Sequence, residues 1–408
     1  MFLSRHVSDL EPDGSLVVDL ASQGGPKLRF GPITHGMSWA RWERDRWVPT
    51  DHDYGILLVN SAHESQRKLP VLDYLGCVPR DVLDGFDRLR HLQATTLQLW
   101  ARWSQAKDLF GSNPALLWLL ASQYVASPDR RHLLTNALDL PQRELLSVIL
   151  RRPVREAQVR LLRRVLFDSG NRAALLNIRR FVMDEEKVMR FRHWPQIPTG
   201  LISLLLEAPY LATFHPLRAD VEAASRPWEF KGLSGERARL LRDTVHLARL
   251  LQPEGYAAQV ITRYRGWARV EELHDKMIRT ARVLGWSALL DSGISIDQRL
   301  CKPPIPAGNG FVPIQTVGEL IAESEAMSHC VMIRARDAID GLAAIYRVNV
   351  AGQRCTLEIS IGDDMEPLAI EQFKLACNGE PSLEAWDAAE KWFAEGCSLW
   401  ARNSVLGG

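Results

Sequence analysis

Residues 315–393 constrain the fold most, because this stretch alone combines ordered secondary-structure signals with a cluster of reactive side chains. Apolar residues at near-helical spacing predict a helix over 317–331, and a polar run predicts a second helix up to Asp340, with Gly341 as its C-cap. Three strand-like runs follow, at 342–350, 355–361 and 368–375, and then a last helical segment. The stretch therefore predicts an α+β domain in which a three-stranded antiparallel meander is flanked by helices.

Several short motifs in this stretch match a known family in their order and spacing. They are Glu319-Leu320, Met327-Ser328-His329-Cys330-Val331, Gly341, Thr356-Leu357-Glu358-Ile359, Gln372 and Asn378, preceded upstream by Val270-Glu271-Glu272-Leu273-His274-Asp275. Through these motifs, residues 270–395 resemble the PcfJ-like proteins, a family named after a conjugative-plasmid protein. The resemblance implies a bacterial protein associated with conjugation, phages and other mobile genetic elements, and it implies no particular reaction.

Composition excludes several classes of protein. A chain of 408 residues, 46% hydrophobic and 24% charged, is long enough for two or three cores. Its 50 Lys and Arg residues nearly balance 49 Asp and Glu residues, which excludes the global basic field of a protein that coats nucleic acid. The six cysteines form no CxxC pair and the N-terminus lacks a signal-peptide core, so we expect a cytoplasmic protein with reduced thiols. No apolar run approaches the ~20 residues of a membrane span, so we expect no membrane partner.

The first 76 residues are predicted to form a small β-rich domain. Short apolar or aromatic runs, separated by turn-forming residues, lie at 16–20, 27–30, 38–42, 46–49 and 54–60. Trp39, Trp42 and Trp47 alternate with arginines, as in platforms that stack nucleic-acid bases. Aromatic pairs that hold a small sheet together are the more frequent arrangement, and we interpret the tryptophans in that way.

Residues 77–300 are predicted to form a mainly α-helical domain. Leu-, Ala- and Arg-rich runs at helical spacing lie at 81–109, 113–125, 130–136, 142–150, 154–168, 172–183, 234–251 and 271–283. Five prolines interrupt the pattern over 192–228. No fixed repeat length distinguishes a solenoid from irregular helical packing. A Pro- and Gly-rich linker at 302–310 then separates this domain from the C-terminal α+β domain at 311–400.

The helical domain carries the most basic part of the chain. Arginines recur at spacings of three and four residues, so they share helix faces and can line a groove for a phosphate backbone. The alternative is a solvated face on which arginines pair with carboxylates such as those of residues 184–186. The candidate nucleic-acid-binding residues are Arg151, Arg152, Arg155, Arg160, Arg163, Arg164, Arg179 and Arg180.

His329, Glu358 and Gln372 are the candidate catalytic residues. Alternation along the second predicted strand puts Thr356 and Glu358 on one face, and Gln372 of the third strand can share that face. An imidazole, a carboxylate and an amide that converge there can hold a nucleotide or perform acid/base chemistry. The alternative is structural: His329 bonds to the sheet at a helix end, and Cys330 packs as a small hydrophobic residue.

Cys330 itself is a poor candidate nucleophile. Neighbouring residues of a helix point about 100° apart, so His329 is not positioned to activate the Cys330 thiol. Metal binding would need further ligands, and Cys355, Glu358 and Cys377 show no spacing of a metal motif. The sequence therefore predicts no metal site and identifies no cofactor.

Three functions are compatible with these features. The preferred one is a nucleic-acid-associated accessory protein of a mobile genetic element, or of a defence system directed against one, which binds through the arginine-rich helices. The second is an enzyme that acts on nucleotides or nucleic acid, with His329 and Glu358 in acid/base roles. The third is a protein-interaction subunit whose helices bind a protein partner. The sequence leaves open whether the chain is an enzyme.

Overall fold

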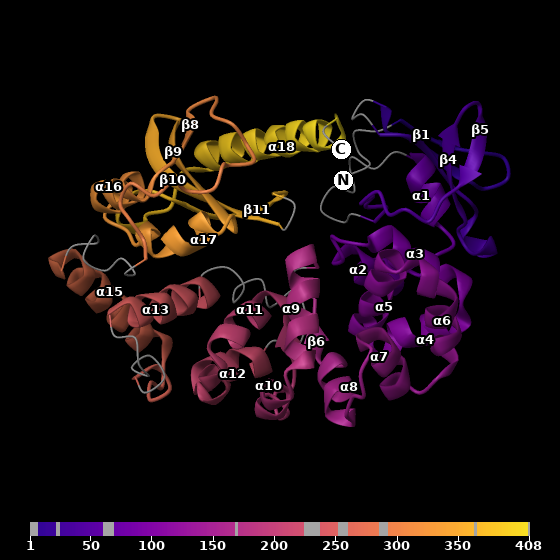
Figure 1. The fold of residues 1–408 in the computed structure, drawn as a ribbon, viewed down its shortest axis with the longest axis horizontal. Coiled ribbons are helices and arrows are strands. Elements are labelled where there is room, and N and C mark those ends of the chain that lie inside the picture. The colour runs from indigo at the N-terminus through magenta and orange to yellow at the C-terminus, as the bar shows by residue number, and fades with distance from the viewer. Residues whose placement is uncertain are drawn as a thin grey trace. The chain divides into compact units, whose positions relative to one another are not determined.

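A computed structural model describes residues 7–21, 25–59, 69–167, 170–223, 237–251, 260–284, 293–362 and 365–406. Contacts divide the chain into two compact units, one formed by Met1–Ala212 and Leu217–Ser234 and the other by Thr213–Pro216 and Gly235–Gly408. Along the chain an antiparallel sheet is followed by a helical middle part and by a second antiparallel sheet with helices (Figure 1). The α+β fold class predicted from the sequence is confirmed.

The first sheet is a five-stranded antiparallel meander in chain order. Its strands are β1 (Val7–Leu10), β2 (Leu16–Asp19), β3 (Lys27–Phe30), β4 (Trp39–Glu43) and β5 (Arg46–Pro49). The sequence predicted the last four of these and missed β1. Trp42 lies directly opposite Trp47, and their rings meet edge to face with centroids 5.1 Å apart. The two rings therefore pack across β4 and β5, as cross-strand aromatic pairs do.

The predicted strand at 54–60 does not form over its described part, residues 54–59. At the end of this stretch, the side chain of Gln93 takes the place of a strand partner. Its amide donates to the carbonyl of Val59 at 2.9 Å and accepts from the Val59 N–H at 2.7 Å. A buried side-chain amide thus satisfies backbone groups that would otherwise need a neighbouring strand.

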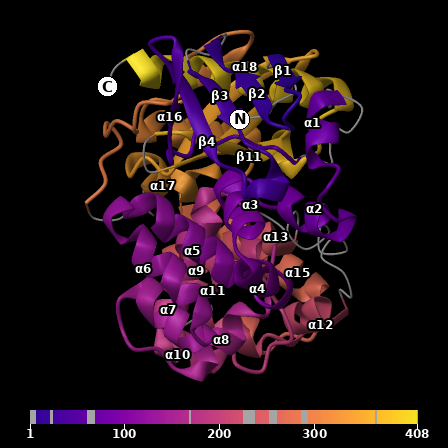
Figure 2. The same ribbon diagram turned by 90° about the vertical axis from the view of Figure 1, so that its right-hand side faces the viewer.

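The helical middle part is a series of short helices, several of which contact one apolar helix, α5 (Pro114–Ala126). Residues 115–121 of α5 are fully buried, and helices on several sides contact it (Figures 1 and 2). The other helices are α1 (Leu69–Leu75), α2 (Arg80–Asp87), α3 (Gln93–Arg102), α4 (Ser104–Ser112), α6 (Arg131–Asn136), α7 (Gln142–Leu150), α8 (Glu156–Leu162), α9 (Arg172–Met183), α10 (Glu185–Arg190), α11 (Thr199–Glu207) and α12 (His215–Ala223). Of these, α3, α4 and α6–α9 contact α5.

The predicted helix at 81–109 is three helices, α2, α3 and α4. Leu92 adopts a left-handed conformation with φ 55°, and Trp103 is extended, so neither residue continues a helix. The proline-rich segment 192–228 contains two helices that the sequence did not predict, α11 and α12. In both, proline precedes the helix or lies in its first turn, where its missing N–H costs no hydrogen bond.

His91 makes the first unit sensitive to acid. Burial, helped by Arg172 and opposed by Asp53, lowers the pKa of His91 from 6.5 to about 4. The unfolded chain therefore binds more protons than the folded chain between these two values. We expect stability to be complete above pH 6.5 and to fall by up to about 3 kcal/mol as the pH drops to about 4.

Urea unfolding of wild type and His91→Gln over pH 4–7 measures this contribution. The backbone carbonyl of His91, which accepts a hydrogen bond from Trp118, is retained in the variant. Other groups titrate equally in both proteins, so the variant is expected to lose less stability on acidification. Parallel stability curves for the two proteins would contradict the prediction.

The second sheet has four antiparallel strands in the order β11-β10-β9-β8. They are β8 (Phe311–Pro313), β9 (Ala343–Val350), β10 (Gln353–Ile361) and β11 (Pro367–Lys374). The last three form the predicted meander. The added strand β8 follows the predicted linker, whose Ile305 is buried in the core and accepts a hydrogen bond from the Tyr346 hydroxyl at 2.9 Å. The linker is thus packed against the domain.

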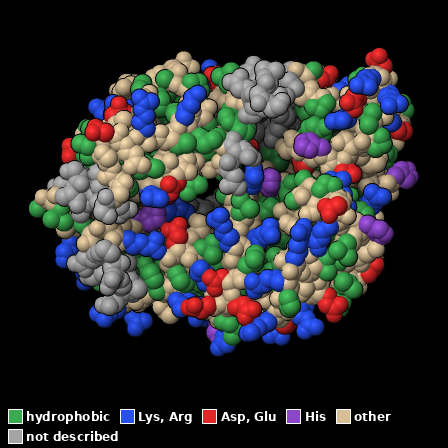
Figure 3. All heavy atoms as spheres, in the orientation of Figure 1, with side chains coloured by type: hydrophobic (Ala, Val, Ile, Leu, Met, Phe, Trp, Pro, Cys, Tyr) green, Lys and Arg blue, Asp and Glu red, His purple; other side chains and the backbone are tan. Residues whose placement is uncertain are grey.

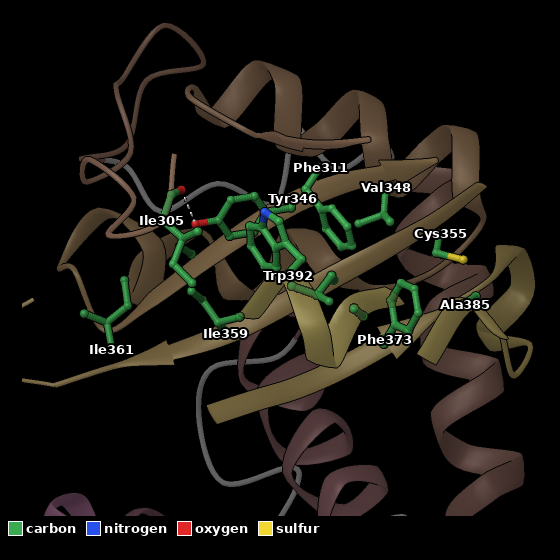
Figure 4. Close-up of a cluster of buried hydrophobic side chains, with 13 residues drawn as sticks. Ile305, Phe311, Tyr346, Val348, Cys355, Ile359, Ile361, Phe373, Ala385 and Trp392 are labelled. Atoms are coloured by element: carbon green, nitrogen blue, oxygen red, sulfur yellow. Dashed lines mark hydrogen bonds between the residues drawn. The ribbon is translucent and has the colours of Figure 1, made fainter. Parts of the chain in front are cut away.

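Helices cover both faces of this sheet (Figure 1). On one face α18 (Leu383–Leu406) closes an apolar core, in which Trp392 stacks on Phe311 with ring centroids 4.3 Å apart (Figure 4). On the other face lie α16 (Val317–Met327), the 3-10 helix η10 (Val331–Arg334) and α17 (Ala335–Ile339). Alternation along β10 sends Leu357 into the apolar core and Thr356 and Glu358 toward η10. The polar face of β10 carries the site.

Helices α13 (Ala238–Leu251) and α15 (Trp267–Leu284) belong to the second unit, although the sequence places them in the helical domain. They pack against each other, and α13 contacts η10. The unit to which a helix belongs depends on its contacts with distant segments. Helical periodicity does not indicate those contacts. Within the described residues, no helix combines the length and the apolar character needed to cross a membrane.

Candidate functional site

A polar pocket lies in the second unit between α13, η10 and strands β10 and β11. Its lining includes all three candidate catalytic residues, His329, Glu358 and Gln372. The pocket has a volume of about 360 Å³, which includes its mouth, open to solvent. The enclosed part of this volume has room for only a few atoms. The wall also contains Asp243, Cys330, Arg334, Thr356, Lys374 and Asn378.

Gln372 enters the pocket because of the strand register. It pairs directly with Glu358 across β10 and β11, so both side chains leave the same face of the sheet. Gln372 and Lys374 are half-buried and Asn378 is exposed. These three residues of the β11 segment form the rim of the pocket, and His329 and Glu358 form its buried wall.

His329 is held by a chain of hydrogen bonds. Its Nε2 lies 2.8 Å from the Thr356 hydroxyl, and that hydroxyl donates to Glu323 at 2.6 Å. Because the single hydroxyl proton goes to Glu323, the Thr356 oxygen accepts from Nε2–H of His329. The Nδ1 atom accepts a longer bond, 3.4 Å, from the Val331 N–H. His329 is 4% exposed and both of its nitrogens are engaged within the protein.

Arg334 holds Glu358, a role that no sequence pattern indicated. Its guanidinium donates twice to Oε1 of Glu358, at 2.8 and 2.6 Å, and contacts Asp337 at 3.0 Å. Burial disfavours the charge of Arg334, but the two carboxylates outweigh burial and raise its pKa. Both partners of the Arg334–Glu358 pair are buried, so neither charge is screened by water.

Three further side chains meet at the pocket wall, from α13, α15 and the turn before η10. Asp243, His274 and Cys330 each offer a potential ligand atom, and these atoms all lie within 4.8 Å of one another. Burial raises the pKa of Asp243, partly countered by Arg334. Burial, together with the nearby Asp243, raises the pKa of the Cys330 thiol well above its usual value. Cys330 is therefore a protonated thiol in the absence of a cation, which agrees with its poor prospects as a nucleophile.

Sequence reasoning did not select Asp243, His274 or Cys330 as metal ligands, because long intervals separate them along the chain. His274 had a weak signal, since it lies in the upstream motif of the family resemblance. Asp243 lies on an ordinary amphipathic helix and had none. The structure brings the three together, and they are the residues that could hold a metal ion.

Several of the candidate nucleic-acid-binding arginines pair with carboxylates. Arg152 and Arg155 both lie close to Glu185, at 3.6 and 3.2 Å. Arg160 contacts Glu156 one helical turn earlier at 3.7 Å. Exposed pairs of this length are weak, so these guanidinium groups remain able to exchange partners.

Other candidate arginines hold the local structure together. Arg164 donates to the backbone oxygens of Arg192 and Trp194, and so fixes the chain after α10. Arg151 and Arg163 donate to uncharged side chains of neighbouring segments, each at 3.1 Å. Replacement of Arg164 therefore tests folding as well as binding.

Arg179 and Arg180 lie on α9, which packs against α8. Arg180 is exposed, as are Arg160 and Arg163 of the α8 segment. Figure 3 shows Lys and Arg side chains interspersed with Asp and Glu over this part of the visible surface. The helical part thus presents exposed arginines on adjacent helices within a surface of mixed charge.

Comparison of the chain with protein-family models, with curated proteins and with solved structures finds no match. Function is therefore inferred from the chemistry of the side chains in the pocket.

Proposed function

We propose that the protein is an enzyme that acts on nucleotides or nucleic acid through the pocket of its second unit. The observation that supports this most is the concentration of charged groups at one pocket: Asp243, Arg334 and Glu358 come from three separate segments. Well-packed apolar residues of the same volume are often at least as stable as a buried ion pair. Clusters of buried ionisable groups in a cleft are typical of functional sites.

The two parts of the pocket suit different tasks. The rim offers the Gln372 amide, which suits the polar edge of a base. It also offers the Lys374 ammonium group, which pairs with Glu380 and would exchange that carboxylate for a phosphate. The buried wall holds its side chains in fixed positions, Glu358 through Arg334 and His329 through Thr356. We assign His329 a positioning role, because a group with both nitrogens engaged inside the protein has no free position for a substrate proton.

Nucleotide binding to rim variants tests the proposal. The panel is the ribonucleoside and deoxyribonucleoside mono-, di- and triphosphates, measured by calorimetry. At least one nucleotide is expected to bind the wild type, and Lys374→Ala is expected to weaken that binding at least about tenfold. Lys391→Ala is the matched control, because Lys391 is exposed on α18, outside the pocket.

Turnover of the bound nucleotide, or of an oligonucleotide containing it, is then followed in the same proteins. Product formation that falls in Lys374→Ala and Gln372→Ala and persists in the control supports the proposal. If no nucleotide binds and no oligonucleotide is altered, the pocket is not an enzyme site for this class of substrate.

A second candidate function is sequence-independent binding of nucleic acid by the helical part, as an accessory protein of a mobile element or of a defence system. The exposed Arg160, Arg163 and Arg180 on α8 and α9 favour it. The association of this function with mobile DNA depends on the resemblance to PcfJ-like proteins.

Charge reversal separates this function from the first. Changing Arg160, Arg163 and Arg180 together to Glu is expected to weaken oligonucleotide binding and to reduce the slope of log affinity against log salt by about 2–3. Arg164 is left intact because it holds backbone carbonyls. Reversal of Arg80 and Arg218, exposed arginines of other helices, is the control. Equal affinities for the triple variant and the wild type would exclude this surface.

A further inference from the structure

We propose that Asp243, His274 and Cys330 bind a zinc ion at the wall of the pocket. A carboxylate oxygen, an imidazole nitrogen and a thiol sulfur converge within 4.8 Å, although α13, α15 and the turn before η10 supply them separately. His274 and Cys330 are buried and Asp243 is half-buried. Oxygen, nitrogen and sulfur donors at this proximity are a ligand set that zinc accepts.

The state of His274 is an independent observation that points to a ligand. The residue is 6% exposed, and its Nε2 atom has no hydrogen-bond partner among the described residues. A buried ring nitrogen without a partner is energetically unfavourable. Its Nδ1 atom lies 3.6 Å from the carboxylate of Asp275. Metal-bound histidines typically donate the second ring N–H to a carboxylate, and Asp275 would have to approach by several tenths of an ångström to accept it.

The nearest cation already has two carboxylate partners. Arg334 contacts Glu358 and Asp337, at 2.6 and 3.0 Å. Asp243 lies beside His274 and Cys330, so an ion held by these three side chains would place positive charge next to its carboxyl group.

The donor types select the metal. Magnesium and calcium prefer sites made only of oxygen ligands, whereas histidine and cysteine favour zinc among the common divalent ions. Zinc–ligand bonds of about 2.0–2.3 Å in a tetrahedron place ligand atoms about 3.5 Å apart. The side chains need to close by little more than about 1 Å from their largest separation of 4.8 Å.

Three protein ligands leave a fourth tetrahedral position open, as in catalytic zinc sites. Asp243 and Cys330 line the pocket, so an ion held by them would lie at its wall. The inference thus rests on the proposed function for the use of the ion, and it names the cofactor of that site. A zinc ion there would polarise or activate a water or a phosphate oxygen beside the rim.

Direct metal binding tests the inference without any substrate. The full-length chain, stripped with chelator and reduced, is titrated with zinc in competition with a chromophoric chelator. One equivalent is expected to bind. Cobalt(II) is then used as a spectroscopic substitute, and a thiolate-to-cobalt charge-transfer band with tetrahedral d–d bands is expected. Binding of zinc without a thiolate band in the cobalt protein would exclude Cys330 as a ligand.

Variants locate the ion. Cys330→Ala, His274→Gln and Asp243→Asn are each expected to weaken zinc binding by more than about 100-fold, and Asp275→Asn by about 10–100-fold. Cys355→Ala is the matched control, because Cys355 is also buried in this unit but faces the apolar core. It is expected to retain both zinc affinity and the cobalt spectrum.

The outcomes separate the two proposals. The metal site is overturned if the wild type binds no zinc, or if Cys330→Ala folds and binds zinc as tightly as the wild type. Neither result changes the conclusion drawn from nucleotide binding at the rim. Zinc binding that depends on the three ligands, in a protein that binds no nucleotide, supports the metal site and counts against the proposed substrate. If Cys330→Ala does not fold, the cobalt spectrum of the wild type decides.

Discussion

Arg334→Met is expected to destabilise the second unit by about 3–5 kcal/mol. The substitution keeps most of the side-chain volume but removes the cation that faces Glu358, which is 2% exposed. A buried carboxylate without a partner costs far more than the intact pair contributes. Amide hydrogen exchange of β9 and β10 measures the free energy of opening of this unit separately from the first.

The double variant Arg334→Met/Glu358→Met is the control. It removes both charges, so at least half of the lost stability is expected to return, because a buried apolar pair is often as stable as a buried ion pair. Asp337 and Asp243 also face Arg334, which makes recovery less than complete. If Arg334→Met alone is as stable as the wild type, water or another group satisfies Glu358. The Arg334–Glu358 pair would then not be what holds the side chains of the pocket wall in place.

Trp392→Ala is expected to destabilise the same unit by about 3–5 kcal/mol for a different reason. The indole is 5% exposed, stacks on Phe311 and meets the edge of Tyr346 with ring centroids 4.8 Å apart (Figure 4). Its removal leaves a cavity between α18 and the sheet that neighbouring side chains fill only in part. Hydrogen exchange of β9 again reports the change.

Leu383→Ala on the same helix is the comparison for Trp392→Ala. Leu383 is 84% exposed, so its truncation is expected to change stability by no more than about 0.5 kcal/mol. Because alanine is the best helix former, helix propensity cannot account for a loss at either position. A loss of similar size at both positions would mean that packing of Trp392 against the sheet does not account for the effect.

The parts of the fold that sequence predicted best are those with strong local signals. Short apolar runs located β2–β5 and β9–β11 to within two residues. The failures occurred where distant side chains determine local structure. Residues 54–59 have the composition of a strand, yet the Gln93 side chain satisfies Val59. Strand β8 is only three residues long and forms because Phe311 and Ile305 pack into a core built from later segments.

The candidate site shows the same division. Strand alternation was sufficient to put Glu358 and Gln372 on one face, because that rule is local. The contributions of Asp243 and His274 were not predictable in this way. Asp243 reaches the pocket because α13 packs on η10, and His274 lies beside Asp243 because α15 packs on α13. The spacing of residues within a helix does not indicate which other helix it will contact.

Strand β10 carries the apolar core on one face and the pocket on the other. The core and the pocket therefore share one strand. Anything that binds in the pocket would also hold the core closed, and would slow hydrogen exchange at Leu357 and Ile359 on the opposite face. Conversely, loosening the core under α18 would lower affinity for a ligand that Trp392 never touches. Substitutions chosen to alter specificity of this pocket would therefore be limited by the stability of the sheet behind it.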